Sequence, residues 1–152
     1  SSDLAIGGKQ SVDDLHKKLG HIMWENVGMA RSKESLQRAI DQIKALREEF
    51  WKDVRVVGKA DDFNVELEKA LRLADFLELG ELMARDALNR EESCGGHFRV
   101  EHQTEEGEAR RDDEHFVYAA VWEYKGMNEA PEMTKEPLDF EFVHPAQRNY
   151  KD

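Results

Sequence analysis

The stretch NVELEKALRLADFLELGELMARDALNREESCGGHFR, residues 64–99, decides the fold that the sequence predicts. Its apolar residues recur at helical spacing on two adjoining faces of one long helix. A surface helix needs only one apolar stripe, so we expect other helices to pack against two sides of this one. The first face is formed by Leu67, Leu71, Ala74, Leu77, Ala84 and Leu88, and the second by Leu73, Phe76, Gly80, Met83 and Ala87.

Both ends of this predicted helix carry recognisable signals. Asn64 is a suitable N-cap residue, and Glu66 suits the positive end of the helix dipole. Gly95 and Gly96 supply the positive φ angles that end a helix. The pattern therefore predicts one helix that stops in a Gly-Gly turn.

Two more helices are predicted before this stretch. A capping box at Ser11 begins a helix that runs to about Val27 and is broken by Gly28. Ser32 is the expected N-cap of a second helix that runs to about Val54. Short links between three helices predict a mainly α protein, in which residues 1–99 form an antiparallel, spectrin-repeat-like three-helix bundle.

The remaining residues, 100–152, are predicted to form an extended C-terminal tail with a β-hairpin. Residues 115–124 read as a strand, and 138–142 alternate cleanly and read as a second strand after a Gly/Pro loop at 125–137. Because an isolated hairpin is marginal in water, we expect the tail to pack on the bundle or on a partner. The face expected to be exposed for such a contact carries Phe116, Tyr118, Trp122 and Tyr124.

Composition restricts the class of protein. A chain of 152 residues fits one domain, and its net charge of −11 argues against binding to nucleic acid or to anionic membranes. No apolar run reaches the length of a bilayer span, and no signal peptide is visible. The single cysteine, Cys94, excludes an internal disulfide and fits a reducing compartment. Since the first residue is not Met, we expect a processed or excised piece of a longer chain.

Candidate catalytic and metal-binding groups are few. His97, His102 and His115 lie among carboxylates, but their spacing matches no zinc motif, so a small metalloprotein is the weakest interpretation. Cys94 is expected at the negative end of a helix dipole, which disfavours a thiolate. We therefore predict no catalytic, cofactor-binding or metal-ligating residue in this chain.

Residues 93–99, called the knuckle below, combine a tight turn with cationic groups. Glycines explain the turn, and we expect His97 and Arg99 to contact a carboxylate or a cluster of backbone carbonyls. Asp112 and Asp113 could act as general acid and base, but nothing in the sequence orients them, and a solvated run is the simpler interpretation. Arg110 and Arg111 suggest ion pairs with the neighbouring acids.

Five segments occur in an order that is typical of one family. Residues 27–31 read V-G-x-x-R, 77–82 read L-E-L-x-E-L, 92–99 read E-S-x-G-x-H-x-R, 111–113 read R-D-D and 148–150 read R-x-Y. In this order they resemble the C-terminal domain of the flavoprotein subunit of succinate dehydrogenase and fumarate reductase. The knuckle and the run at 101–113, E-H-Q-T-x-x-G-E-A-x-R-D-D, look most like the bacterial anaerobe-type branch of this family. The chain departs from the family at Cys94, where many relatives carry arginine, and we expect Arg99 to make the contact of that arginine.

This resemblance implies a function for the chain. In the family, a larger upstream part holds FAD and the dicarboxylate site, and this chain has no G-x-G-x-x-G motif. The chain would be a non-catalytic helical domain of an oxidoreductase of electron transport and the citric acid cycle that interconverts succinate and fumarate. Its implied partners are the upstream FAD-binding domain and the iron–sulfur subunit, in a complex at the cytoplasmic face of the bacterial inner membrane.

A freestanding acidic helical protein-interaction module is the alternative function. In either case, the expected interface or structural residues are Ser93, Gly95, Gly96, His97, Arg99, Asp112, Asp113, Phe116, Tyr118, Trp122 and Tyr124.

Overall fold

The computed structural model describes residues 7–56 and 64–148 and comprises two units. The helical unit consists of residues 1–28 and 34–85, and the tail unit consists of residues 29–33 and 86–152. Each unit is described below by itself.

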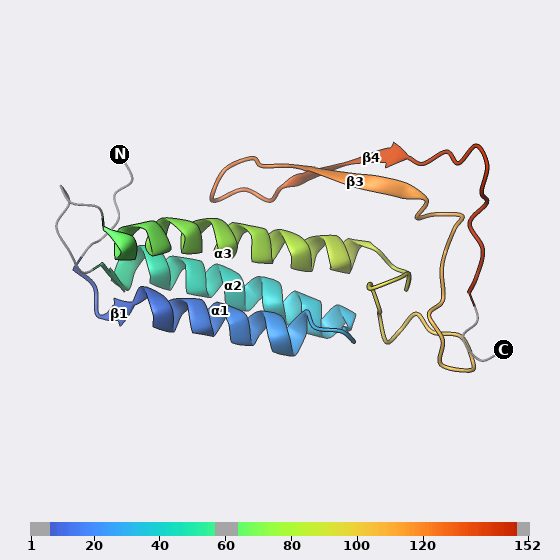
Figure 1. Cartoon of the computed structure of the whole chain (residues 1–152). Coiled ribbons are helices and arrows are strands. Elements are labelled where there is room, and N and C mark those ends of the chain that lie inside the picture. The colour runs from blue at the N-terminus through green and yellow to red at the C-terminus, as the bar shows by residue number, and fades with distance from the viewer. Residues whose placement is uncertain (1–6, 57–63, 149–152) are drawn as a thin grey trace. The chain divides into compact units, whose positions relative to one another are not determined.

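The helical unit is built on three antiparallel helices, as the sequence predicts (Figure 1). They are α1 (Val12–Asn26), α2 (Lys33–Asp53) and α3 (Val65–Asn89), and the first residue of α2 and the last four of α3 belong to the tail unit. Two predicted caps are confirmed. The Ser11 hydroxyl accepts from the Asp14 N–H at 3.1 Å, and the Asn64 side chain accepts from the N–H groups of Glu66 and Leu67.

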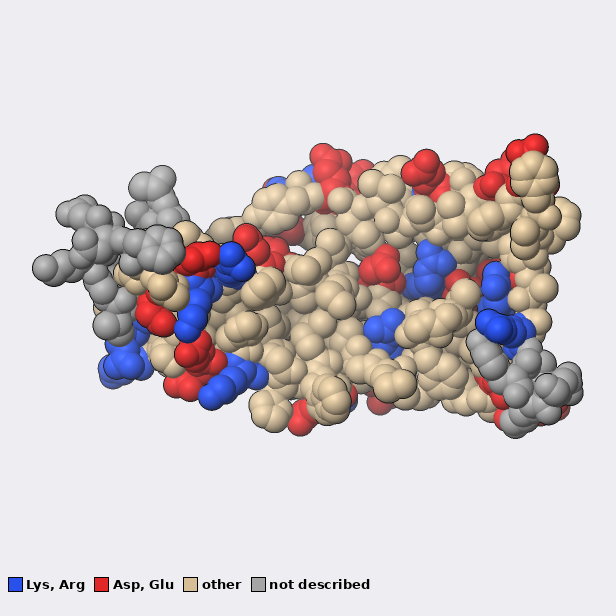
Figure 2. Space-filling view, viewed as in Figure 1, with Lys and Arg blue, Asp and Glu red and all other residues tan. Residues whose placement is uncertain are grey.

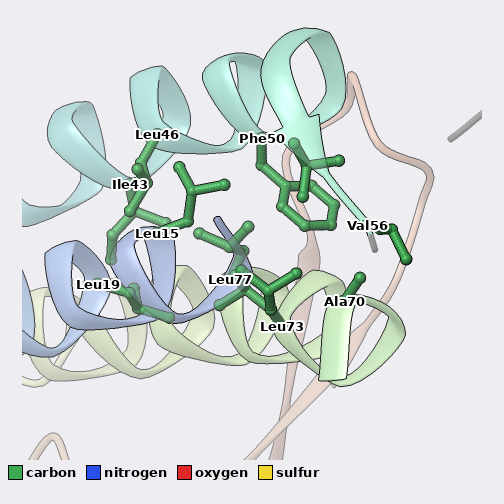
Figure 3. Close-up of a cluster of buried hydrophobic side chains, with 11 residues drawn as sticks. Leu15, Leu19, Ile43, Leu46, Phe50, Val56, Ala70, Leu73 and Leu77 are labelled. Atoms are coloured by element: carbon green, nitrogen blue, oxygen red, sulfur yellow. The ribbon is translucent and has the colours of Figure 1, made fainter. Parts of the chain in front are cut away.

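The hydrophobic core lies where the three helices face one another. Figure 3 shows the buried side chains of all three helices pointing toward a common centre. Fully burying one such aliphatic side chain stabilises the fold by about 1.5–3 kcal/mol, so this cluster is the main source of stability in the helical unit. Its helical members are Val12, Leu15 and Leu19 from α1, Ile43, Leu46 and Phe50 from α2, and Ala70, Leu73 and Leu77 from α3.

The two predicted apolar faces of α3 are only partly buried. Leu73 and Leu77 lie in the core, whereas Leu71, Phe76 and Met83 are exposed. Phe76 instead stacks on the ring of His16, with the ring centroids 5.5 Å apart. Two neighbouring helices cover a limited arc of α3, so apolar residues outside that arc remain at the surface.

The sequence did not predict a short parallel strand pair in the helical unit. Strand β1 (Gln10–Ser11) pairs with β2 (Val54–Arg55), and the Gly8 N–H donates to the Val54 carbonyl at 3.2 Å. A Cβ atom on Gly8 would lie 1.9 Å from the Asp53 carbonyl oxygen, so only glycine fits at this close approach.

Charged groups of the helical unit form ion pairs within the unit. The buried Arg47 guanidinium pairs with Glu81 and with Glu78, and Arg85 also pairs with Glu81 at 2.9 Å. Burial favours a raised pKa for Glu81, but the hydrogen bonds from Arg47 and Arg85 outweigh it and lower that pKa. On the face drawn in Figure 2, basic side chains mostly lie beside acidic ones.

The tail unit contains the predicted hairpin, but its second strand lies elsewhere. Strand β3 (Tyr118–Glu123) pairs antiparallel with β4 (Glu132–Pro137), from the Tyr118–Pro137 pair to the Glu123–Glu132 pair. The prediction of a strand at 138–142 is therefore wrong, and all of β4 falls in the predicted loop at 125–137. The side chains of β4 are mostly exposed, so burial imposes no alternating pattern on its sequence.

Candidate functional site

The knuckle is a tight turn separate from α3. Helix α3 ends at Asn89, so the predicted continuation to Gly95 is wrong. The N–H of Cys94 donates to the His97 carbonyl at 2.8 Å, and the N–H of His97 returns a bond to the Cys94 carbonyl at 3.0 Å. Of the two central glycines, Gly95 has a positive φ of 58°, whereas Gly96 does not. Cys94 therefore lies in this turn and not at a helix end.

Arg99 is the most deeply buried cation of the knuckle, with 2% of its surface exposed. Its Nη1 group donates to the carbonyls of Ala87, Leu88 and Arg90 at 3.0, 3.2 and 3.4 Å. These carbonyls lie at or just beyond the C-terminal end of α3, where the helix dipole favours a cation. Arg99 thus caps α3, and the predicted contact with a carbonyl cluster is confirmed.

A carboxylate completes the environment of Arg99. The guanidinium donates from Nε and Nη2 to the two oxygens of Glu101, each at 3.3 Å. The same carboxylate accepts from the N–H of Lys33, the first residue of α2. Burial alone would raise the pKa of Glu101, but the Lys33 and Arg99 bonds outweigh it and lower this pKa to about 2. Glu101 is therefore ionised at neutral pH.

His97 lies between a guanidinium and a backbone carbonyl. Arg31 Nη2 donates to His97 Nδ1 at 2.7 Å, so the ring hydrogen resides on Nε2, which donates to the Arg90 carbonyl at 2.9 Å. Burial lowers the pKa of His97, and the charges of Arg31, Arg99 and Arg90 lower it further, against the opposing effect of the Arg90 carbonyl. His97 is therefore a neutral, oriented ring.

Residues 29–33 bring Arg31 to this cluster through the backbone. The Arg31 N–H donates to the Phe98 carbonyl at 3.1 Å, and the Arg31 carbonyl accepts from the Val100 N–H at 2.9 Å. Burial and then the charge of Arg99 lower the pKa of Arg31. Arg31, which lies far from His97 and Arg99 in the sequence, thus meets both of them at one place in the tail unit.

Ser93 fixes the start of the knuckle and is fully buried. Its hydroxyl accepts from the Arg99 N–H at 2.8 Å and donates to the Arg99 carbonyl at 3.1 Å. Both hydrogen-bonding roles of this hydroxyl are therefore filled by the backbone of Arg99, and no side chain among the described residues bonds to it.

The two aspartates of the R-D-D segment, Asp112 and Asp113, make different kinds of contact. The N–H of Asp112 donates to the buried carboxylate of Glu92 at 2.9 Å, and the Asp112 carboxylate accepts from His115 Nδ1 at 2.9 Å. Burial opposes but does not outweigh the His115 bonds, which lower the pKa of Asp112. Asp113 pairs with Arg111 at 2.7 Å, which confirms the expected ion pair for Arg111. Arg110 instead donates from Nη2 to His102 Nδ1 at 3.5 Å.

The aromatic residues predicted to share an exposed face do not have equal exposure. Tyr118 is 6% exposed and Phe116 and Trp122 are half-buried, whereas Tyr124 is 62% exposed. The Trp122 indole N–H donates to the carboxylate of Asp86 at 2.8 Å. The expectation that all four face solvent is therefore wrong, because contacts within the tail unit already use three of them.

Arg90 explains the burial of these rings, and sequence reasoning missed it. Its guanidinium lies 4.8 Å from the centre of the Tyr118 ring and 5.8 Å from that of Phe116. It also donates to the carbonyls of both residues, at 2.9 and 2.8 Å, and pairs with Glu92 at 3.0 Å. A basic residue directly after the helix was the available signal, since cations favour that end of a helix.

The described residues form no metal site, since no group of three or more His, Cys, Asp or Glu side chains in residues 7–56 and 64–148 could hold an ion. Within the same residues, no helix has both the length and the apolar character that crossing a bilayer requires. The contacts that the structure shows around the knuckle are hydrogen bonds and ion pairs.

Known proteins resemble the chain over most of its length. A family model described as "Fumarate reductase flavoprotein C-term" matches residues 16–150. The fumarate reductase flavoprotein subunit of Haemophilus influenzae is 29% identical, over 94% of this chain and 22% of that subunit. The succinate dehydrogenase flavoprotein subunit of Bacillus subtilis is 25% identical, over 97% of this chain and 24% of that subunit.

A solved structure shows the same fold. A mutant E. coli quinol fumarate reductase matches with a TM-score of 0.80 and 26% identity, over 96% of this chain and 24% of the other. The chain therefore spans about a quarter of the length of the relatives that it matches.

Proposed function

Because the chain belongs to the family of C-terminal domains of fumarate reductase and succinate dehydrogenase flavoprotein subunits, we propose that it is the non-catalytic helical part of such an enzyme. The whole enzyme interconverts succinate and fumarate. In this proposal the chain braces the FAD-binding part of the polypeptide and also contributes a contact to the iron–sulfur subunit.

The observation that carries this proposal is that the cationic side chains of the knuckle already make their hydrogen bonds within the protein. An arginine that binds a dicarboxylate must reach solvent before the substrate arrives. Arg99 is 2% exposed and already donates to three carbonyls and a carboxylate, and His97 bonds at both ring nitrogens. These groups support a brace, because they hold the end of α3 and residues 29–33 in a fixed arrangement.

The described residues do not fit FAD. A flavin dinucleotide places its pyrophosphate on backbone N–H groups at a helix start, often after a glycine-rich turn. The Gly95-Gly96 turn comes after α3, and the nearby guanidinium of Arg99 is engaged with protein oxygens. FAD binding therefore belongs to the upstream part of the polypeptide in this proposal, and no step of the reaction is assigned to this chain.

Tyr124 is the best candidate for the subunit contact, because it is the most exposed of the four aromatics around β3. An exposed tyrosine offers a large apolar ring and one polar group, a combination that is enriched at protein interfaces. The proposed complex lies at the cytoplasmic face of a bacterial inner membrane, where the other subunits anchor it.

Flavin binding and turnover test this division of function. We expect the purified chain to stay colourless after FAD is added and to show no succinate oxidation with an electron-accepting dye. The full-length flavoprotein is expected to bind flavin and to be active in the same assay. Stoichiometric flavin binding or dicarboxylate turnover by the chain alone would contradict the proposal.

A further inference from the structure

Residues 138–147, called the strap below, follow β4 as an irregular segment (Figure 1). Residues 139–146 make no hydrogen bond with any other residue of the described ranges. Backbone N–H and C=O groups that water alone satisfies can pair with a strand of another segment.

The strap also exposes large apolar side chains. Leu138 and Phe140 are each 45% exposed, Phe142 is 87% exposed and Val143 is 70% exposed. Leu138, Phe140 and Phe142 lie at alternating positions, with Asp139 and Glu141 between them. Exposed apolar residues gathered in one short segment mark an interaction site.

Both ends of the strap are held by the tail unit. The Leu138 N–H donates to the Val117 carbonyl at 3.2 Å. At the other end, the Gln147 side chain accepts from the Arg111 N–H at 3.2 Å and donates to the Ala109 carbonyl at 2.6 Å. A segment anchored at two points loses less conformational entropy when it binds than a free tail would.

We propose that the strap pairs as an added strand with the upstream part of the same flavoprotein, and that Phe140 and Phe142 pack into an apolar surface there. This inference rests on the proposed function. In strand addition, backbone hydrogen bonds supply affinity and alternate side chains enter pockets. The alternation that predicted a strand at 138–142 is then accounted for, because the pairing edge lies outside this chain.

One observation and one general argument favour the upstream part over a separate subunit. The relatives are about four times longer than this chain, so the same polypeptide supplies most of the remaining protein. A partner in the same chain is present at high effective concentration, so the exposed side chains are covered as soon as the polypeptide folds. A partner in the same polypeptide would cover the strap permanently, and this would keep its exposed apolar residues from promoting aggregation.

Hydrogen exchange of the full-length flavoprotein subunit tests the inference. The subunit is purified without the iron–sulfur and membrane subunits, and exchange is followed at the amides of residues 139–144 and Ala146, since Pro145 has no amide hydrogen. We expect these amides to exchange at least about tenfold more slowly than in an unstructured peptide, since a paired strand must open before exchange. Adding the other subunits should not slow exchange further.

A matched pair of double variants identifies the face that binds. The change of Phe140→Ser with Phe142→Ser should abolish the protection and lower the thermal unfolding temperature of the subunit. The control, Asp139→Ser with Glu141→Ser, alters the intervening positions and should preserve both.

Several outcomes would overturn the inference. Unprotected amides in every preparation would show that the strap has no partner. Protection that appears only with the iron–sulfur subunit, or only in a dimer of the flavoprotein, would identify a different occupant. A subunit that binds flavin and is active but leaves the strap unprotected overturns this inference alone, whereas turnover by the isolated chain overturns the proposed function.

Discussion

Gly95 and Gly96 are sequence neighbours with different backbone requirements. Gly95 has a φ of 58°, and a Cβ atom on either glycine would meet no atom within 4 Å. Gly95→Ala should therefore cost about 1–2 kcal/mol of unfolding free energy from backbone strain alone. Gly96→Ala should cost less than about 0.5 kcal/mol. Urea unfolding followed by circular dichroism compares the two, and equal losses would contradict the assigned turn.

The neutral His97 ring gives the chain a pH-dependent stability. The pKa of His97 is lowered in the folded state from its ordinary value of 6.5. Between the folded pKa and pH 6.5, the unfolded state therefore binds more protons than the folded state. The contribution of the neutral His97 ring to the unfolding free energy is fully present above about pH 6.5, and it is lost as pH falls toward the folded pKa. Urea unfolding of wild type and His97→Gln at several pH values should show their stability difference shrinking below pH 6.5.

The exposed His21 supplies the control for this experiment. His21→Gln should cost less than about 0.5 kcal/mol of unfolding free energy, as expected for an exposed position. A stability difference between wild type and His97→Gln that stays constant with pH would contradict the bonding assigned to the ring.

At the scale of the element, α3 offers two leucines in contrasting surroundings. Leu73 is 1% exposed in the core, and Leu71 is 45% exposed. Leu73→Ala should cost about 2–5 kcal/mol, because it leaves a cavity among packed side chains. Leu71→Ala should cost less than about 1 kcal/mol. Thermal and urea unfolding measure both, and a similar cost at the two positions would place the core on the wrong face of α3.

The helices could be predicted because burial shapes their sequences. The core positions recur every three or four residues in all three, and polar caps such as Ser11 and Asn64 mark their starts. The end of α3 was harder to place, since its last carbonyls bond to Arg99, ten residues beyond Asn89. A C-cap supplied from a distance leaves no signal in the adjacent sequence.

The strands show the limit of pattern reading. Strand β4 has mostly exposed side chains and hence no alternation. Of the alternating residues 138–142, only Leu138 makes a backbone hydrogen bond within the described residues, to the Val117 carbonyl. Strands β1 and β2 have two residues each, which is too short for any period. An alternating pattern of apolar residues indicates that one face of a strand is buried, but it does not identify the segment that covers that face.

The candidate cluster could be recognised only in part. Three of its residues lie close together in the sequence and were singled out there: Ser93, His97 and Arg99. The side-chain partner of His97, however, is Arg31, which lies 66 residues earlier. The resemblance to a family placed Arg31 in a motif without indicating its contact. Glu101 and Arg90 were missed, because charged residues are common in this sequence and a buried one looks the same as an exposed one.

At the scale of the whole molecule, two tyrosines separate stability from assembly. Tyr118 is buried beneath the Arg90 guanidinium, and Tyr124 is exposed. Tyr118→Ala should cost about 3–5 kcal/mol, whereas Tyr124→Ala should cost less than about 0.5 kcal/mol. In the full-length flavoprotein, Tyr124→Ala should nevertheless reduce co-purification of the iron–sulfur subunit. Unchanged recovery of that subunit would remove Tyr124 from the proposed interface.

The exposed strap has a consequence for the fate of the protein in a cell. Proteases bind their substrates in an extended form, and residues 139–146 offer accessible peptide bonds next to Phe140 and Phe142. Under the proposed pairing, a copy whose strap is covered is shielded from cleavage there, and a copy that fails to cover it stays open to cleavage. Degradation of copies in which the strap is uncovered would then begin at the strap itself.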